Sequence, residues 1–186
     1  MLKRLFGRRS SANRIIVDSL YAKIVAAARQ PELYSEWHVP DTPLGRFEMV
    51  GLHLFLLLHR VRGETGAIRD VAQELTDEFF RDVEHSIREL GISDPGVPKR
   101  MKKLARMFYG RVVSYGDAID ADDRQALAEA IARNVRPDVD GWPEADRLTA
   151  YVITAAQGLA ALTIDAILQG SAEFPSPLSV PGERSA

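Results

Sequence analysis

Apolar residues recur along most of the chain every three or four positions, which is the period of one face of an α-helix. No stretch alternates convincingly at the period of two that a half-buried strand requires. The pattern predicts a first helix over residues 13–29, a connection rich in proline and aromatic residues over 31–42, a second helix over 43–63 and a third over 65–90. Gly91 follows the third helix as its expected C-terminal cap.

Three more helices are expected in the second half of the chain. Pro98 is suited to start the fourth, which continues to about residue 118. Asp120 is the expected N-cap of the fifth, which ends near residue 134, and a long sixth helix is expected over 143–169. The predicted fold is therefore all-α: a single bundle-like domain of about six helices with flexible termini.

The helical pattern also sets the expected domain limits. Residues 12–170 are predicted to form the helical domain, preceded by a basic, flexible N-terminus over residues 1–11. The tail over residues 171–186 is rich in proline and serine and is predicted to be disordered. The first fourteen residues lack the apolar core and the cleavage site of a secretory signal.

Two apolar segments have to be tested as membrane spans. Residues 49–58 cover only about half of a bilayer core, because a spanning helix needs about 20 residues. Residues 148–164 contain no charged side chain but include three threonines and a glutamine, and Asp165 follows at once. Both segments are therefore predicted to be helices of a packed core.

The residues that could support catalysis or metal binding are sparse. The chain has no cysteine, which excludes disulfides, thiolate zinc sites and a cysteine nucleophile. His53 and His59 are six positions apart, or about 240° around a helix, so they cannot be ligands on one face. Asp82 and His85 approximate one half of a di-iron motif, but no second copy exists. We therefore predict a non-enzymatic protein and assign no catalytic residue, no metal ligand and no cofactor.

Charge is segregated along the chain, although the net charge is only −2. Residues 1–14 carry five basic side chains and no acid, and residues 99–111 carry six and no acid. The rest of the chain is correspondingly acidic. Two basic segments on an acidic body predict an anionic partner such as lipid headgroups, RNA or an acidic protein. A solvated face stays open as the alternative for either segment.

The basic segment 99–111 lies in the fourth predicted helix. An apolar stripe from Met101 to Val112 predicts that one face of this helix packs on the core, and most of the cations lie away from it. Like charges four positions apart on a helix repel each other. An anionic partner would reduce this repulsion between the basic side chains. Tyr109 and Tyr115 are candidates for stacking on RNA bases. The candidate residues for binding an anionic partner are Lys99, Arg100, Lys102, Lys103, Arg106, Tyr109 and Arg111.

The turn before the second helix has a capping pattern of its own. Pro40 stiffens the backbone, and either Asp41 or Thr42 can cap the helix that follows. Trp37 and Phe47 are expected to be half-buried beside the start of that helix. Capping explains the turn without a functional role.

Three segments taken in order resemble a known family. They are WHVPDTPLGRFEMVGLHLFLLLHRVRG, LTDEFFRDVEHSIRELGISD and VPKRMKKLARMFYGRVVSYGDAI. Together they resemble the ubiquinol–cytochrome c chaperones, the assembly factors of ubiquinol–cytochrome c reductase in mitochondria and alphaproteobacteria, over residues 12–170. The resemblance implies a non-enzymatic helical protein that associates with newly made cytochrome b. For mitochondrial members it also implies a small helical partner protein and contact with the ribosome.

The resemblance also supplies candidate residues and a location. The first fourteen residues are too few for a convincing mitochondrial presequence, which favours a bacterial member of the family. A cytoplasmic protein, peripheral on the inner membrane, is then expected, or one on the matrix side in a eukaryote, and DNA is not expected as a partner. The candidate residues for binding the client or a partner are Trp37, Pro40, Asp41, Thr42, Arg46, Phe47, Glu48, Asp77, Phe79, Phe80 and Asp82.

Two other functions stay open from the sequence. A helical bundle that binds a lipid or a quinone would need a closed apolar cavity with a few converging polar groups. A general RNA- or ribosome-binding module would be recognised by the salt dependence of its binding.

Overall fold

A computed structural model describes residues 2–91 and 94–179, with side chains from residue 13 onward. Over these residues the protein is helical without strands, which confirms the predicted all-α fold. The α-helices are α1 (Leu2–Ala28), α2 (Pro31–Ser35), α3 (Pro43–Arg60), α4 (Ala67–Glu89), α5 (Val97–Asp120), α6 (Arg124–Val135), α7 (Ala145–Ala160) and α8 (Ile164–Leu168). Two short 3-10 turns cover Asp94–Gly96 and Pro177–Ser179.

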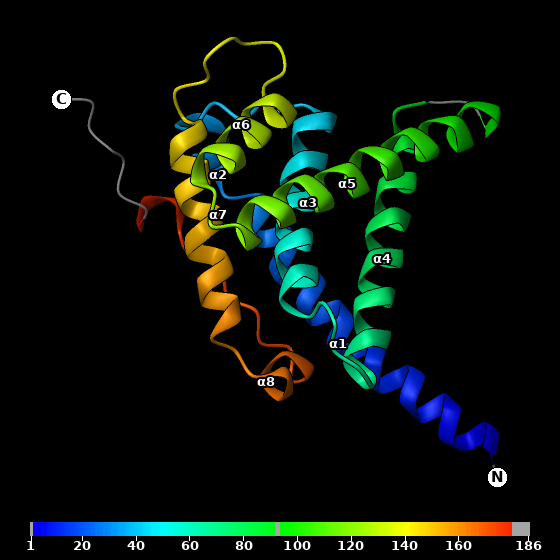
Figure 1. Cartoon of the computed structure of the whole chain (residues 1–186). Coiled ribbons are helices and arrows are strands. Elements are labelled where there is room, and N and C mark those ends of the chain that lie inside the picture. The colour runs from blue at the N-terminus through cyan, green and yellow to red at the C-terminus, as the bar shows by residue number, and fades with distance from the viewer. Residues whose placement is uncertain (1, 92–93, 180–186) are drawn as a thin grey trace.

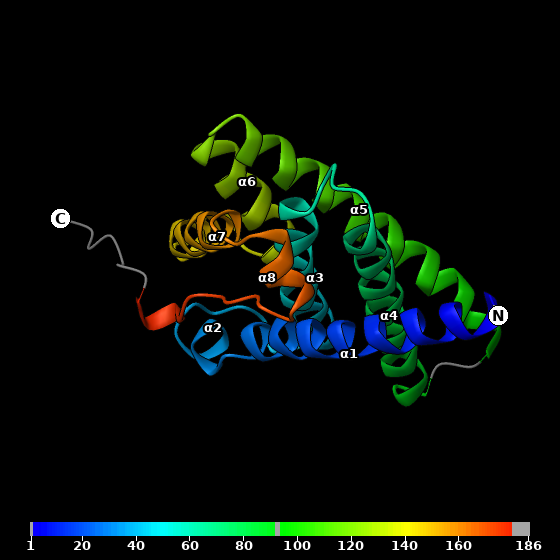
Figure 2. The same ribbon diagram turned by 90° about the horizontal axis from the view of Figure 1, so that it is seen from below.

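Helix α3 is the centre of the fold and contacts α1, α4, α5, α6 and α7. Figure 2 shows α1 crossing α3 and α4 on one side, while α5 crosses them on the other and leads into α6 and α7. Every residue from Gly51 to Leu57 is buried, because α3 is apolar almost all round and must be covered on every side. Its apolar segment is therefore the packed centre of the domain, as predicted. In the described part of the chain, no helix combines the length and the apolar character that a bilayer crossing requires.

Several element boundaries differ from those that the sequence predicts. Helix α1 begins at Leu2, well before residue 13, and the connection after it contains α2. Asp120 is the last residue of α5, and Asp123 caps α6 instead, accepting a hydrogen bond from the Ala126 N–H at 2.9 Å. The predicted sixth helix is two helices, since Thr163 starts α8 as a new N-cap.

The segment after α8, which its composition predicts to be disordered, packs on the core over residues 171–179. Ala172 is buried, and the ring of Phe174 stands edge-on to the His53 imidazole with ring centroids 5.0 Å apart. The Gln30 side chain donates a hydrogen bond to the Pro175 carbonyl at 3.4 Å. Pro177 is buried as well, and the turn Pro177–Ser179 contacts α2, so this stretch is held against the core by packing that composition alone does not reveal. Residues 180–186 lie outside the described residues (Figure 1).

A buried polar contact joins α3 to α7 in the core. His53 is fully buried; its Nδ1–H donates to the Met49 carbonyl at 2.7 Å, and the Tyr151 hydroxyl donates to Nε2 at 2.7 Å. Because a carbonyl can only accept, Nδ1 carries a proton, and in the neutral imidazole Nε2 is then free to accept from Tyr151. Burial lowers the pKa of His53 to about 4.

Stability is expected to fall on acidification because of His53. Its folded-state pKa of about 4 is below the ordinary value, so the unfolded chain takes up a proton that the folded protein excludes. The neutral His53 contributes to the free energy of unfolding above pH 6.5. As the pH falls towards 4, the free energy of unfolding drops by about 3 kcal/mol. Urea unfolding between pH 7 and pH 4 measures it, and His53→Gln serves as the non-titrating control. Equal pH slopes for the two proteins would contradict this expectation.

Candidate functional site

A groove of about 1040 Å³ opens between the start of α3, the end of α4 and the start of α5. Arg29, directly after α1, and Tyr34 of α2 complete its edge. Much of the lining is apolar, and two of the apolar side chains, Leu44 and Leu90, are 45% and 58% exposed. Six lysines or arginines and three acids also line it, so the groove is cationic although the whole protein is not.

The first wall of the groove is the N-terminal turn of α3. Thr42 is its N-cap and accepts a hydrogen bond from the Gly45 N–H at 3.1 Å, and Pro43 occupies the first turn. Asp41 does not cap the helix; its carboxylate accepts a hydrogen bond from the Arg46 side chain at 2.7 Å. That bond lowers the pKa of Asp41. Both charges are exposed at the rim, where the pair contributes little to stability.

Gly45 is required where this turn folds back on itself. A Cβ there would stand 1.9 Å from the Pro40 carbonyl oxygen, which is backbone and cannot rotate away. Gly45→Ala is therefore expected to destabilise the protein by about 1–3 kcal/mol. Gly110→Ala in α5 is the matched control, because nothing lies within 4 Å of a Cβ there. The free energy of unfolding of the Gly110→Ala control should rise by about 0.5–1 kcal/mol, because alanine favours a helix over glycine. Chemical denaturation of both variants checks the predicted opposite signs.

The second wall is α4, held by aromatic packing on one side and by polar contacts on the other. The Phe79 ring is buried against Phe47 and Phe108, with centroids 5.5 and 5.2 Å away. Asp82 lines the groove, and its carboxylate accepts a hydrogen bond from the Tyr21 hydroxyl of α1 at 3.0 Å. Burial and the neighbouring Asp82 raise the pKa of Tyr21, so this hydroxyl stays a donor.

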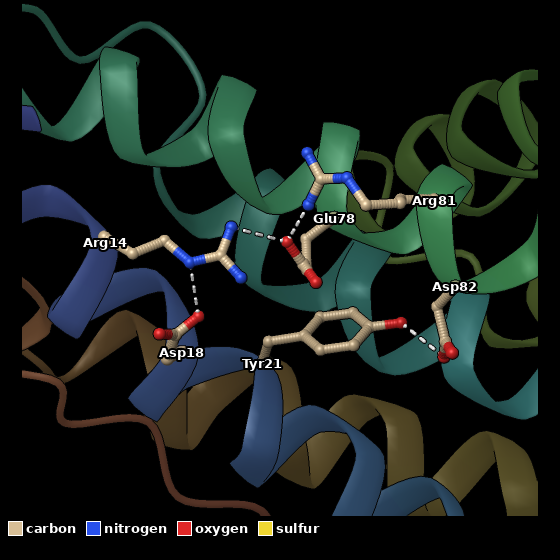
Figure 3. A network of polar contacts seen from close by, with 6 residues as sticks. All are labelled: Arg14, Asp18, Tyr21, Glu78, Arg81 and Asp82. Carbon is tan, nitrogen blue, oxygen red and sulfur yellow. Dashed lines mark hydrogen bonds and ion pairs between the residues drawn. The ribbon is translucent and has the colours of Figure 1, made fainter. Parts of the chain in front are cut away.

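Figure 3 shows that the contact between α1 and α4 continues as a polar network. The Arg14 guanidinium bridges Asp18 on its own helix and Glu78 on α4, each at 2.9 Å. Arg81 also pairs with Glu78. These groups fix the position of the α4 wall relative to α1.

The third wall is the first half of α5, which supplies Lys99, Arg100, Lys103 and Arg106. All four side chains are exposed, and none has an ion-pair partner among the described residues. The groove thus brings the turn before α3 and the basic helix together, although the sequence treats them as two separate surfaces. Of the predicted residues it combines Asp41, Thr42, Arg46, Phe47, Phe79, Asp82, Lys99, Arg100, Lys103 and Arg106.

Some predicted binding residues belong to the core instead. Trp37 is fully buried rather than half-buried, and Phe47 is also buried. Glu48 is 4% exposed, and both of its oxygens accept hydrogen bonds from the Arg111 guanidinium, at 2.5 and 2.6 Å. Tyr115 is buried as well, so it cannot stack on a base. Glu48 and Arg111 therefore join α3 to α5 and are not available to a partner.

The remaining predicted residues lie outside the groove lining. Asp77 and Lys102 are exposed on α4 and α5. Phe80 is partly buried, and its ring lies 6.2 Å from that of Tyr109, which is 53% exposed. Pro40 is partly buried behind the turn, where its carbonyl faces Gly45.

Sequence reasoning missed several apolar residues of the groove. Leu44, Leu90 and Met107 were not singled out, although Leu104 was part of the recognised stripe on α5. One signal was available: Leu44 and Leu90 lie at helix ends next to a glycine, where a leucine has no neighbouring turn to cover it. Among the described residues, no group of three or more His, Asp or Glu side chains could hold a metal ion.

The described residues thus form a helical protein with a cationic groove on its surface. The chain belongs to the ubiquinol–cytochrome C chaperone family, whose sequence model matches residues 35–174. This confirms the family that the sequence motifs indicate. The structure is similar to the crystal structure of the Cbp3 homolog from Brucella abortus, with 55% sequence identity and a TM-score of 0.90. The match covers 97% of this chain and 100% of that one.

Two relatives from vertebrates are more distant. Ubiquinol-cytochrome-c reductase complex assembly factor 1 of Xenopus laevis is 26% identical over 122 residues, covering 66% of this chain and 60% of that protein. The protein of the same name from Mus musculus is 25% identical over 120 residues, covering 64% of this chain and 40% of that protein. The matched region thus spans only part of the length of these curated relatives.

Proposed function

We propose that this protein is a non-enzymatic assembly factor for ubiquinol–cytochrome c reductase that holds a segment of newly made cytochrome b in the groove. The observation that carries the proposal is the groove itself: exposed leucines and unpaired cations lie side by side in a member of this chaperone family. Exposed apolar patches on a protein surface mark interaction sites. Covering apolar segments of a client until they are assembled is the task such a surface can perform.

The proposal includes a place at the membrane surface. Lys102 is exposed outside the groove, and residues 1–14 supply five more cations. Basic clusters are attracted to anionic lipid headgroups, by about 1 kcal/mol for each Lys or Arg near the surface. The protein would then meet cytochrome b peripherally, at the face of the membrane where that subunit is inserted. A small helical partner protein and the ribosome are further candidate partners under the same proposal.

The direct test is deletion of the gene, followed by quantification of assembled reductase and of cytochrome b. Both should fall strongly and return when the wild-type gene is restored. Normal levels of both in the deletion strain would reject the proposed function.

A groove variant in the same strain tests where the client binds. Leu44→Asp places a charge in the apolar part of the groove at a side chain that is already 45% exposed. It should leave stability within about 0.5 kcal/mol of the wild type and reduce assembled reductase strongly. Val113→Asp is the matched control, because Val113 is 60% exposed on α5 but does not line the groove. Equal assembly in the two variants would place the client elsewhere.

A further inference from the structure

We propose that the groove binds an amphipathic α-helix whose acidic side chains repeat at helical spacing along one edge of its apolar face. The proposal rests on the proposed function, because it names the kind of client segment that the groove accepts. The α5 wall carries the argument, through the order of its charged and apolar positions.

Two parallel rows of α5 side chains face the groove. Lys99, Lys103 and Arg106 form a cationic row at spacings of four and three, so they lie on one face of the helix. Leu104 and Met107 lie beside this row, in line with Arg100, which also lines the groove. The cationic row extends about 10 Å along the axis, at a rise of 1.5 Å per residue. A second helix packed along α5 would meet both rows at once.

The charges of the cationic row are not neutralised within the groove. The acids that line it are engaged elsewhere: Asp41 with Arg46, Asp82 with Tyr21, and Glu89 with His85 at 3.2 Å. No described carboxylate pairs with the three cations of the row. The row is therefore complementary to carboxylates from outside, in the way that charges flanking an apolar seam select the partner of a helix.

The apolar part of the groove suits a helix rather than a flat surface. Leu44 of α3 and Val83 of α4 line the same groove as Leu104 and Met107 of α5, so all three walls supply apolar side chains. A helix docks into such a groove through apolar anchors at positions i, i+3, i+4 and i+7. Methionine adapts to different side chains, which suits a surface that must accept an incoming segment.

The linear spacing of the three cations also favours a peptide helix over a lipid headgroup as the ligand of the groove. A single phosphate is bound by donors that converge on one point. Lys99 and Arg106 are about 10 Å apart along the axis of α5, so the three charges are spread along a line and not arranged around one point. Carboxylates spaced along a peptide helix match this separation.

The test uses the full chain and synthetic 18-residue peptide helices in a fluorescence anisotropy titration. One peptide carries leucines on one face with glutamates along its edge, a second replaces the glutamates by lysines, and a third is a scrambled form of the first. The acidic peptide should bind at least about tenfold more tightly than the lysine peptide, since three exposed ion pairs add up to this effect. The scrambled peptide should bind weakly, because it lacks an apolar face.

The preference should depend on the cationic row. The variant Lys99→Gln/Lys103→Gln/Arg106→Gln is expected to lose the tenfold preference and to keep the weaker binding through the leucines. A matched variant with Lys102→Gln, outside the groove, should behave as the wild type. Added salt should reduce the preference as well.

Three results would overturn the inference. They are equal or tighter binding of the lysine peptide, equal binding of the scrambled peptide, and an unchanged preference in the triple variant. Vesicles of phosphatidylglycerol are the remaining probe: if they displace the acidic peptide and lose binding in the triple variant, the groove is a lipid site. The proposed function is tested separately by reductase assembly in the deletion strain, so it can stand when the peptides do not discriminate.

Discussion

Arg111→Met is expected to destabilise the protein by about 3–5 kcal/mol. The reason is Glu48, which is 4% exposed and whose two carboxylate oxygens are bonded only to the Arg111 guanidinium in the described structure. Methionine fills a similar volume but leaves the carboxylate buried without a counter-charge. Such an uncompensated charge costs far more than the loss of a surface pair.

Urea unfolding at pH 7 measures this cost, and Arg14→Met is the matched control. Arg14 also bridges two carboxylates, those of Asp18 and Glu78, but its side chain is 51% exposed. The control should lose at most about 1 kcal/mol, because Asp18 is 54% exposed to water and Glu78 keeps its ion pair with Arg81. A loss of similar size in the two variants would contradict the buried character of the Glu48–Arg111 pair.

The pH dependence gives a second readout of the same pair. Burial raises the pKa of Glu48, and the hydrogen bonds and charge of Arg111 oppose this rise. Without Arg111 the folded-state pKa is higher still, so the folded variant keeps a proton that the unfolded chain releases. The stability of Arg111→Met should therefore fall as the pH rises from 4 to 7 relative to the wild type.

The double variant Glu48→Leu/Arg111→Met completes the experiment. Replacing both partners by apolar side chains removes the uncompensated charge, so stability should return to near the wild-type value. If the double variant also retains reductase assembly, the pair serves the fold alone. Loss of assembly in a fully stable double variant would instead give Glu48 or Arg111 a role in binding.

Trp37→Ala is expected to cost a similar amount, about 3–5 kcal/mol. The Trp37 ring is fully buried, packs edge-on against Tyr151 at 5.8 Å between centroids, and lies under the Arg147 guanidinium at 5.2 Å. The Trp142 side chain donates to the Trp37 carbonyl at 3.1 Å, which ties the same segment to the loop before α7. Alanine leaves a cavity that the neighbours on α7 and in the loop before it fill only in part.

Thermal and urea unfolding followed by circular dichroism test this expectation. Leu44→Ala is the comparison from the same turn region, and it should stay within about 0.5 kcal/mol of the wild type. Trp37→Phe should recover much of the lost stability, because it restores an aromatic ring in the same space. A change of less than about 1 kcal/mol in the free energy of unfolding of Trp37→Ala would contradict the place of this residue in the core.

These two results would distinguish residues that hold the fold together from residues that face the groove. Trp37, Glu48 and Arg111 hold the elements that form the groove, whereas Leu44 and Lys103 face its space. Loss of assembly on changing the first set would follow from loss of folding. Loss of assembly on changing the second set, with stability intact, would follow from loss of binding.

The sequence alone determined the helical class, most of the helix positions and the family. These depend on periodicity, proline and capping residues, which act within a few positions along the chain. Thr42 is an example, since its side chain reaches the Gly45 N–H without help from any other element. Local sequence patterns did not distinguish Asp41 from Thr42 as the N-cap of α3. They also predicted Asp120 as the N-cap of the helix that Asp123 caps in the structure.

The partners of the side chains were decided only by the tertiary structure. Glu48 and Arg111 are separated by 63 positions, and Tyr21 and Asp82 by 61, so no local pattern could pair them. Tertiary packing also decided which of the large apolar side chains near the turn before α3 is buried: Trp37 is buried, whereas Leu44 is exposed. It brought the turn before α3 and the basic start of α5 to one groove, because α4 and α5 turn back across α3. The residue composition and the hydrophobic periodicity of a segment predict which face of its helix is apolar. Which two faces come into contact depends on how the helices cross in the folded protein.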